Sequence, residues 1–419
     1  MQEPKVEAKG KLALISYLFF VTATFGFLQP FVPLYFKTGH PENLVIGLMI
    51  GCSTAAALFL QPVWGRLSDR FDTRRPFIFG LGVSAALAYL SFPHVKGVWA
   101  FMVLNAVGQN AVIYLNAVGG VLVGRMVAKQ KGGATYANYR LWGSIGYIVV
   151  TLAVGFTLGE SAKNLDLVSL NRAFSTAPFI FVFAALLAFW VPDFHKEKSK
   201  RNKMGPPPLP KNLKWFLACY FLYQFTLYGA STYLSLFMRT LTNNYAWVTA
   251  MFAGGVVCEV LVLRVSGRFS DEYGRRPLLV FTYLLLPVRL ALYALCQSPY
   301  QVFLVQLLHG FNFGIMGAVA VALINDLCSD ENRGQAQARL AVASGLAAST
   351  SPIVLGWLCD RLGYRGMFLG VAGLAAVAAA ILVLKLEETH PSARLLADRV
   401  PQRLKGLMKV LDGPVRRKG

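Results

Sequence analysis

The sequence predicts an all-α integral membrane protein, with twelve transmembrane helices in two six-helix bundles related by internal pseudo-symmetry. Three observations predict this class: the composition, a series of long apolar runs, and two polar motifs that each occur once in either half. Of the 419 residues 55% are hydrophobic and only 15% are charged, whereas soluble domains carry about 25% charged residues. This apolar fraction also excludes a disordered chain.

Each apolar run is about 18 to 25 residues long, which is enough to cross the hydrocarbon core of a bilayer as a helix. The first run is too long for a secretory signal and lacks a small-residue cleavage site, so we expect it to be a retained span. Short polar segments join neighbouring runs. The twelve predicted spans are 12–35, 44–64, 76–92, 98–124, 141–159, 173–192, 213–238, 246–266, 277–296, 300–325, 339–359 and 364–385.

The basic residues predict the orientation of these spans. The chain has 41 Lys and Arg against 20 Asp and Glu, a formal net charge of +21. With the N-terminus inside, 32 of the 41 lie in inside segments and 7 in outside segments, while Arg264 and Arg289 lie within spans. Cytoplasmic loops carry such an excess. We therefore expect a multi-pass protein of the cell (inner) membrane with both termini cytoplasmic, and no nucleic-acid partner.

Residues 193–212 are charged and then proline-rich, so they cannot form a span. We predict that they form a cytoplasmic linker between an N-terminal bundle at 1–192 and a C-terminal bundle at 213–385. A basic cytoplasmic tail follows at 386–419. The tail either lies on the anionic inner leaflet as an amphipathic segment or is disordered.

Two motifs repeat between the halves. The segment GRLSDRFDTRRP follows the second span, and GRFSDEYGRRP follows the eighth, at an offset of 202 residues from Gly65 to Gly267. A second echo pairs Arg140, before span five, with Arg339, before span eleven, at an offset of 199. Two echoes at nearly one offset predict duplicated six-helix halves, which is the architecture of many secondary transporters.

At these residues the chain resembles the major facilitator superfamily, across its full length. The resemblance implies that the two loops gate the transporter by latching one conformation, with glycines permitting close helix approach and the aspartates lying against helix N-termini. Alternatively, the loops serve topology alone. Asp72 stands where the family usually has glycine, and Glu272 where it usually has a base. The matching residues are Gly65, Asp69, Arg70, Arg74 and Arg75 in the first copy and Gly267, Asp271, Gly274, Arg275 and Arg276 in the second.

A narrower resemblance begins at Arg140, in the segment RLWGSIGY that opens span five. It is similar to the proton-symporter branch that includes lactose permease, nucleoside–proton symporters and phenylpropionate-type transporters. The matching positions Arg140, Ser144 and Tyr147 are spaced i, i+4 and i+7, so they share one helix face. The resemblance implies that this face binds substrate. The alternative is that Arg140 only extends its charge to the cytoplasm.

Ionisable residues inside spans are costly, so Glu259, Arg289 and His309 in spans eight, nine and ten are informative. A carboxylate whose cationic partner changes has a variable proton affinity, and histidine titrates near neutral pH. The same branch carries Glu, Arg and His in this order, which implies roles in proton coupling and substrate binding. Alternatively, Glu259 and Arg289 form a packing pair, and His309 only binds a carbonyl.

The sequence also departs from the branch. Lactose permease has a further carboxylate one turn after the His, where this chain has Asn312, and its galactoside-binding carboxylate in helix four has no match at Leu122 or Val123. Nucleoside symporters carry Gln one turn before the Glu, where Val256 stands here. These departures argue against lactose and weaken both the sugar and the nucleoside assignment.

Four further amides are candidate substrate-binding residues. Gln29 precedes two prolines that kink span one, Asn105 and Gln109 start a polar stripe on span four, and Gln224 lies among tyrosines of span seven. Each is also compatible with a simple hydrogen bond between helices.

Other function classes find no support in the sequence. It has no Walker A motif, so direct use of ATP is not expected. The six cysteines show neither a metal-binding spacing nor a disulfide pattern. We therefore expect no enzyme activity, no cofactor and no metal.

The resulting hypothesis is a monomeric secondary active transporter in the lipid bilayer. It would import a small organic solute, namely a nucleoside, an aromatic acid or a saccharide, by proton symport and alternating access. One alternative is a proton-coupled exporter of drugs or sugars, although span one lacks the carboxylate that would favour it. An alternative of another class is a non-transporting membrane scaffold or receptor.

Overall fold

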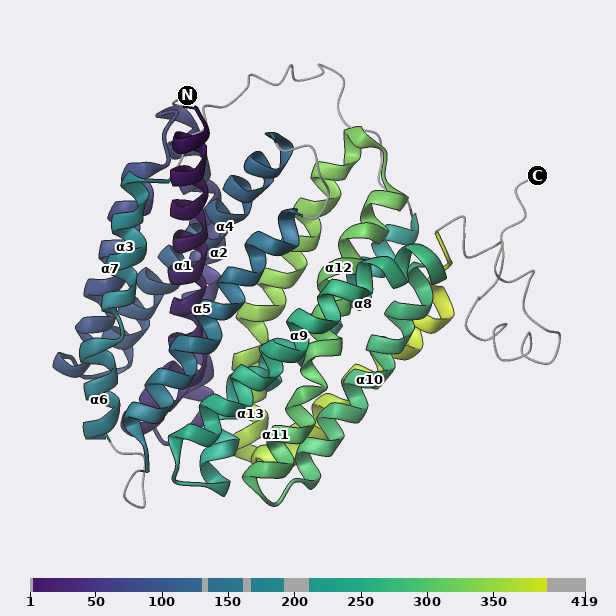
Figure 1. Ribbon diagram of the computed structural model, residues 1–419. Coiled ribbons are helices and arrows are strands. Elements are labelled where there is room, and N and C mark those ends of the chain that lie inside the picture. The colour runs from purple at the N-terminus through teal and green to yellow at the C-terminus, as the bar shows by residue number, and fades with distance from the viewer. Residues whose placement is uncertain (1–2, 130–134, 161–166, 192–210, 390–419) are drawn as a thin grey trace. The chain divides into compact units, whose positions relative to one another are not determined.

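The computed structural model describes the chain except for residues 1–2, 130–134, 161–166, 192–210 and 390–419. The regular structure of the described residues is helical (Figure 1), apart from one isolated bridge between Glu160 and Asn244. The predicted linker at 193–212 and tail at 386–419 lie almost entirely outside the described residues. The helices are α1 Glu3–Gly39, α2 Asn43–Arg70, α3 Arg75–Leu90, η1 Phe92–His94, α4 Val98–Lys129, α5 Thr135–Leu158, α6 Leu167–Thr176, α7 Phe179–Leu186, η2 Leu187–Phe189, α8 Lys211–Leu241, α9 Tyr245–Tyr273, α10 Arg275–Leu295, α11 Pro299–Leu307, α12 His309–Leu327 and α13 Asp330–Lys385.

Ten helical segments of the described chain are long and apolar enough to span a membrane. One of them, Asn332–Lys385, has 54 residues and contains Gly363, whose φ of 68° and ψ of 175° break the helix. Gly363 lies between the predicted spans eleven and twelve. The predicted span seven lies in α8, which has 31 residues but a more polar sequence. These two features account for the difference between ten and twelve spans.

Two spans each consist of two helices. Span six consists of α6 and α7, with Pro178 as the N-cap of α7, because proline lacks the N–H group that a continuous helix needs. Span ten consists of α11 and α12, which meet at Leu308, whose φ of −63° and ψ of −18° remain helical. The start of α11 is well defined, since Ser298 and Gln301 form a capping box and Pro299 follows the cap.

The N-terminal helices pack through small residues. α1 packs along α5, while α4 packs against both α2 and α3. A Cβ at Gly146 of α5 would overlap the carbonyl group of Phe19, and a Cβ at Gly26 of α1 would lie 2.6 Å from the carbonyl oxygen of Tyr147. Close backbone approach at small residues is typical of helix packing in membranes, so glycine is required at these two positions.

The described chain forms two compact units. Unit 1 consists of Met1–Lys200, Thr232–Ala253 and Pro352–Asp360, and unit 2 consists of Arg201–Ser231, Gly254–Ser351 and Arg361–Gly419. These units cut across the two bundles that the sequence predicts at 1–192 and 213–385, which remain a prediction. Parts of α8, α9 and α13 belong to unit 1 because they pack on N-terminal helices. For example, Thr249 of α9 packs against Gly155 of α5.

Candidate substrate, coupling and gating sites

Arg289 lies at the centre of a polar network inside unit 2. The side chain is 1% exposed, and its guanidinium donates hydrogen bonds to the hydroxyl of Tyr293 at 3.1 Å and to Oδ1 of Asn312 at 2.8 Å. Tyr293 in turn donates to Gln306, and Asn312 donates to the carbonyl oxygen of Thr282 at 3.0 Å. Helices α10, α11 and α12 thus surround a buried cation with neutral partners.

Glu259 and His309 lie close to each other in the same unit. Gly310 of α12 packs against the backbone of α9, where its Cβ would lie 2.6 Å from the Glu259 nitrogen. His309 is the first residue of α12, is 7% exposed, and packs against Phe313 with the ring centroids 4.5 Å apart. Its Nδ1 accepts no hydrogen bond in the described part of the chain.

The three predicted coupling residues lie in two adjoining groups of side chains. Glu259 is partly buried in α9 and lies within electrostatic range of Tyr228 in α8. The Phe313 ring that contacts His309 also lies 6.2 Å from the Tyr228 ring. Arg289 donates its hydrogen bonds to Tyr293 and Asn312. Glu259 and His309 thus share one neighbourhood, and Arg289 belongs to the adjoining network.

Gln224 is also buried in unit 2. Its Nε2 donates to the hydroxyl of Tyr220 at 2.8 Å and to Oγ of Ser344 at 3.3 Å, whereas its Oε1 has no hydrogen-bond partner among the described residues. A buried amide oxygen without a donor is costly. An occupant that donates a hydrogen bond here would remove that cost.

In unit 1 the structure brings two predicted substrate residues together. The Tyr147 hydroxyl of α5 donates to Oε1 of Gln29 in α1 at 2.9 Å. Tyr147 is buried, Ser144 and Gln29 are partly buried, and Arg140 is exposed at the start of the same face. The close packing of α1 on α5 positions this pair.

The span-four amides lie elsewhere in unit 1. Asn105 is fully buried and accepts a hydrogen bond at 3.1 Å from the hydroxyl of Tyr89 in α3. Gln109 is partly buried one turn further along α4. Asn105 therefore bridges two helices, and a role for either amide in substrate binding remains a prediction.

The first gating loop closes α2 with a Schellman turn. Asp72 has a φ of 49° at the position after the C-cap, and the Thr73 N–H bonds to the Ser68 carbonyl at 3.3 Å. Asp72 thus adopts the left-handed conformation for which the family motif uses glycine. Arg74 lies 3.7 Å from the Asp69 carboxylate, and Arg75 donates to the Val191 carbonyl at 3.1 Å.

The second loop has a denser set of contacts. Arg275 donates to Asp271 at 2.5 Å and to Asp326 at 2.9 Å. Arg276 is 1% exposed and donates to the carbonyl groups of Leu386 and Val383 at the end of α13. The Glu388 carboxylate accepts from the backbone N–H groups of both arginines at 3.0 and 2.9 Å, so it caps the positive N-terminus of α10.

Open space surrounds the two loop glycines. A Cβ at Gly65 or Gly267 would meet no atom of the described chain within 4 Å. The close helix approach that the motif implies at these glycines is therefore not present in this conformation. Gly274, by contrast, has a φ of 97° and a ψ of 168°, a backbone conformation that is essentially restricted to glycine.

A further polar cluster at the start of α2 was not predicted from the sequence. The Asp360 carboxylate accepts hydrogen bonds at 2.8 Å from the backbone N–H groups of Asn43 and Leu44 and from Nδ2 of Asn43. The Tyr233 hydroxyl approaches the Asn43 and Pro352 carbonyl oxygens at 3.0 and 2.6 Å. All of these residues belong to unit 1.

Sequence reasoning missed this cluster because the partners of its hydrogen bonds lie more than 100 residues apart in the chain, and Asp360 lies more than 300 from Asn43. Asp360 and Glu388 each follow the end of a predicted span and cap the N-terminus of a distant helix. An isolated acid just outside a span was the only signal, and it does not identify the helix that is capped. The neutral partners of Arg289 were visible only as the departure at Asn312.

Comparison with known proteins places this geometry in a family. The model of the MFS_1 like family matches residues 12–348. A homologue of the multi-drug resistance efflux pump PmrA from Lactococcus lactis is 24% identical, with 84% of this chain and 89% of the relative covered. A maltose permease from Geobacillus stearothermophilus is 23% identical, with 91% of this chain and 96% of the relative covered.

Solved structures agree in fold. A mutant of the nucleoside transporter NupG superposes with a TM-score of 0.76 at 15% identity and covers 89% of this chain and 98% of its own. The inward-open xylose transporter XylE from E. coli superposes with a TM-score of 0.70 at 14% identity and covers 92% of this chain and 99% of its own. The all-helical membrane fold predicted from the sequence is confirmed. The chain belongs to the MFS_1 like family of the major facilitator superfamily and is a multi-pass secondary transporter, not an enzyme.

Proposed function

We propose that this transporter imports a small organic solute together with protons. The observation that carries the proposal is the neighbourhood of Glu259 and His309 in unit 2, beside the buried Arg289 network. Both titratable side chains belong to the close contact between α9 and α12, and the network of a fixed cation adjoins them. A carboxylate in this position binds or releases a proton as its surroundings change.

Candidate solute-binding groups occur in each unit, taken by itself. In unit 1 the candidates are Gln29 and Tyr147, with Arg140 and Ser144 on the same face of α5. In unit 2 Gln224 contributes an amide oxygen that lacks a donor among the described residues. Tyrosines and amides suit a nucleoside, an aromatic acid or a saccharide, and the maltose permease relative gives a reason to include disaccharides in the assay.

Efflux is the second candidate function, because the relatives include multi-drug efflux pumps. In an exporter the same proton site would drive solute in the opposite direction. The direction of coupled transport therefore separates the two candidates.

The test is solute flux in liposomes that contain the purified protein and an imposed inward proton gradient. Labelled nucleosides, aromatic acids and disaccharides are compared for the wild type, Glu259→Gln and Glu272→Gln. Glu272 is the matched control, since it lies exposed at the end of the same helix. We expect gradient-driven accumulation that Glu259→Gln abolishes and Glu272→Gln leaves in place. Accumulation that survives Glu259→Gln would contradict the coupling role, and extrusion without uptake would favour the exporter.

A further inference from the structure

A groove of about 610 Å³ lies between α2 and α3 in unit 1. Trp64 of α2, Gly80 and Ser84 of α3, and Val107 and Asn110 of α4 line it. Because α4 packs against both α2 and α3, it forms the floor of the groove. The volume is in the range of small-molecule sites, which is about 300–1,000 Å³. None of the residues assigned to solute binding or coupling lines this groove.

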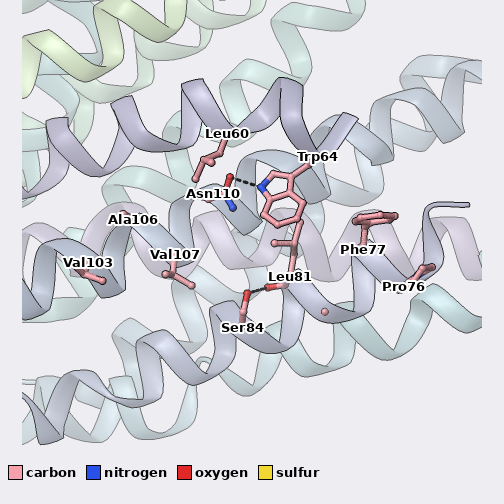
Figure 2. Close-up of a pocket in the computed structure, with 11 residues that line it drawn as sticks. Leu60, Trp64, Pro76, Phe77, Leu81, Ser84, Val103, Ala106, Val107 and Asn110 are labelled. Atoms are coloured by element: carbon pink, nitrogen blue, oxygen red, sulfur yellow. Dashed lines mark hydrogen bonds between the residues drawn. The ribbon is translucent and has the colours of Figure 1, made fainter. Parts of the chain in front are cut away.

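The groove has few polar groups, and two of its three polar side chains donate hydrogen bonds within the protein. Trp64 Nε1 donates to Asn110 Oδ1 at 3.1 Å, and Ser84 Oγ donates to the Leu81 carbonyl at 2.8 Å, as Figure 2 shows. The rest of the lining is apolar, and Val103 and Val107 of the floor are 58% and 39% exposed. The groove therefore lies on the apolar surface of spanning helices and favours a hydrocarbon occupant.

One end of the groove is adjacent to a basic loop. Figure 2 shows Pro76 and Val103 at opposite ends. Pro76 directly follows Arg74 and Arg75, in a loop whose four arginines outnumber Asp69 and Asp72. Arg75 is exposed and uses one N–H group for the Val191 carbonyl, which leaves further donors of its guanidinium available. Basic side chains at a membrane surface attract anionic lipid headgroups.

We propose that this groove binds an anionic glycerophospholipid. One acyl chain lies along α4 between α2 and α3, and the phosphate lies at Arg74 and Arg75 at the start of α3. The apolar lining fits the chain, the scarcity of polar groups disfavours a polar occupant, and the basic loop selects the charge of the headgroup. This inference does not depend on the transported solute or on the direction of transport.

Trp64 provides the probe, because phospholipids with brominated acyl chains quench tryptophan fluorescence on contact. The protein is placed in phosphatidylcholine nanodiscs that contain increasing fractions of brominated phosphatidylglycerol or, in a parallel series, brominated phosphatidylcholine. Subtraction of the Trp64→Phe signal isolates Trp64 from the six other tryptophans. We expect half-maximal quenching at a fraction of brominated phosphatidylglycerol about fivefold lower than that of brominated phosphatidylcholine. This is the preference that one basic residue near the surface produces.

Two glycine variants separate the groove from the general lipid surface. A Cβ at Gly80 or at Gly120 of α4 meets no atom within 4 Å, and both residues are exposed. Gly80→Leu fills the groove and is expected to abolish the anionic preference, whereas Gly120→Leu is expected to retain it. If Gly80→Leu does not fold, Ala106→Leu fills the groove from its floor.

The double variant Arg74→Gln, Arg75→Gln tests the role of the basic charge in selecting the headgroup. We expect it to make the quenching curves of phosphatidylglycerol and phosphatidylcholine coincide, while quenching itself persists. Coincident curves in the wild type would overturn the proposal and leave only unselective boundary lipid. An anionic preference that persists unchanged in both Gly80→Leu and Ala106→Leu would also overturn it.

Discussion

Asn312 gives Arg289 a neutral partner, so a full positive charge remains inside unit 2. The side chains of Asn312 and Arg289 are 0% and 1% exposed. A buried guanidinium is tolerated when its donors are hydrogen-bonded, and it becomes costly when one acceptor is lost. In lactose permease, which belongs to the branch that the chain resembles, a carboxylate stands at this position. Here the amide holds the guanidinium through Oδ1 and fixes its own orientation through the Thr282 carbonyl.

This contact predicts a difference between two nearly isosteric replacements. Asn312→Leu leaves a guanidinium N–H group without an acceptor and is expected to lower stability by about 2–3 kcal/mol. Asn312→Asp keeps the acceptor and adds an opposite charge, so its loss should be smaller. Thermal unfolding of the purified variants in detergent measures both. Equal melting temperatures for the two variants would contradict this account of Asn312.

The second gating loop allows a test of backbone conformation at single residues. Gly274→Ala places a side chain in a backbone region that is essentially restricted to glycine and is expected to cost about 1–3 kcal/mol. Gly267→Ala lies in the same motif but within α9, where open space surrounds it, and alanine favours a helix by about 0.5–1 kcal/mol over glycine. The melting temperature should therefore fall for the first variant and rise for the second. A fall in both would show that the space at Gly267 is filled.

At the scale of elements, the spans could be predicted well, because a run of about 20 apolar residues has few alternatives to a transmembrane helix. Gly363 even breaks α13 between the predicted spans eleven and twelve. Span ten runs without a break through Leu308, whose backbone angles remain helical, in agreement with the absence of proline at that point. Which helices pack against each other could not be predicted, because helix faces that contact lipid and helix faces that contact protein have similar apolar compositions.

The interface between α1 and α5 shows how small residues position a site. Gly146→Ala would drive a methyl group into the Phe19 carbonyl, so the helices must separate. We expect a loss of about 1–3 kcal/mol in stability and weaker solute binding through the adjacent Tyr147–Gln29 pair. Gly120→Ala on α4, where the space is open, is the matched control and should not lower either quantity. Thermal unfolding and the KM of uptake check the two effects.

At the scale of the whole molecule, the predicted gating loops of the two sequence halves share one contact, in which an arginine of the loop binds a distant backbone carbonyl. Arg75 binds the Val191 carbonyl after η2, and Arg276 binds the Leu386 carbonyl after α13. The motif predicted these arginines but not their partners, because each partner follows the sixth span of its half, more than 100 residues away. The arrangement of charges within a motif is local, whereas the contacts that these loops make depend on the folded chain.

Asp360 has the geometry of a releasable contact. Its carboxylate caps α2, where two backbone N–H groups and the positive end of the helix favour an anion. The segment that carries it belongs to the second half of the sequence but to unit 1 of the structure. Gly356, on the same helix, comes so close that a Cβ would overlap the Asn43 carbonyl. Close backbone contact and a few hydrogen bonds hold this end of α2 together, and both are lost when the segments separate.

The neighbouring Cys359, which is 4% exposed, reports such separation in a variant that keeps this cysteine alone. Asp360→Asn removes the charge from the cap, and charge-assisted hydrogen bonds contribute about 1.5–3 kcal/mol. The open population, and with it the rate of maleimide labelling at Cys359, should rise at least about tenfold. Glu42→Gln removes a neighbouring charge that makes no capping bond to α2, so it should leave the rate unchanged. An equal rise in both variants would assign the effect to local charge, and no rise in Asp360→Asn would show that close backbone packing alone keeps this end closed.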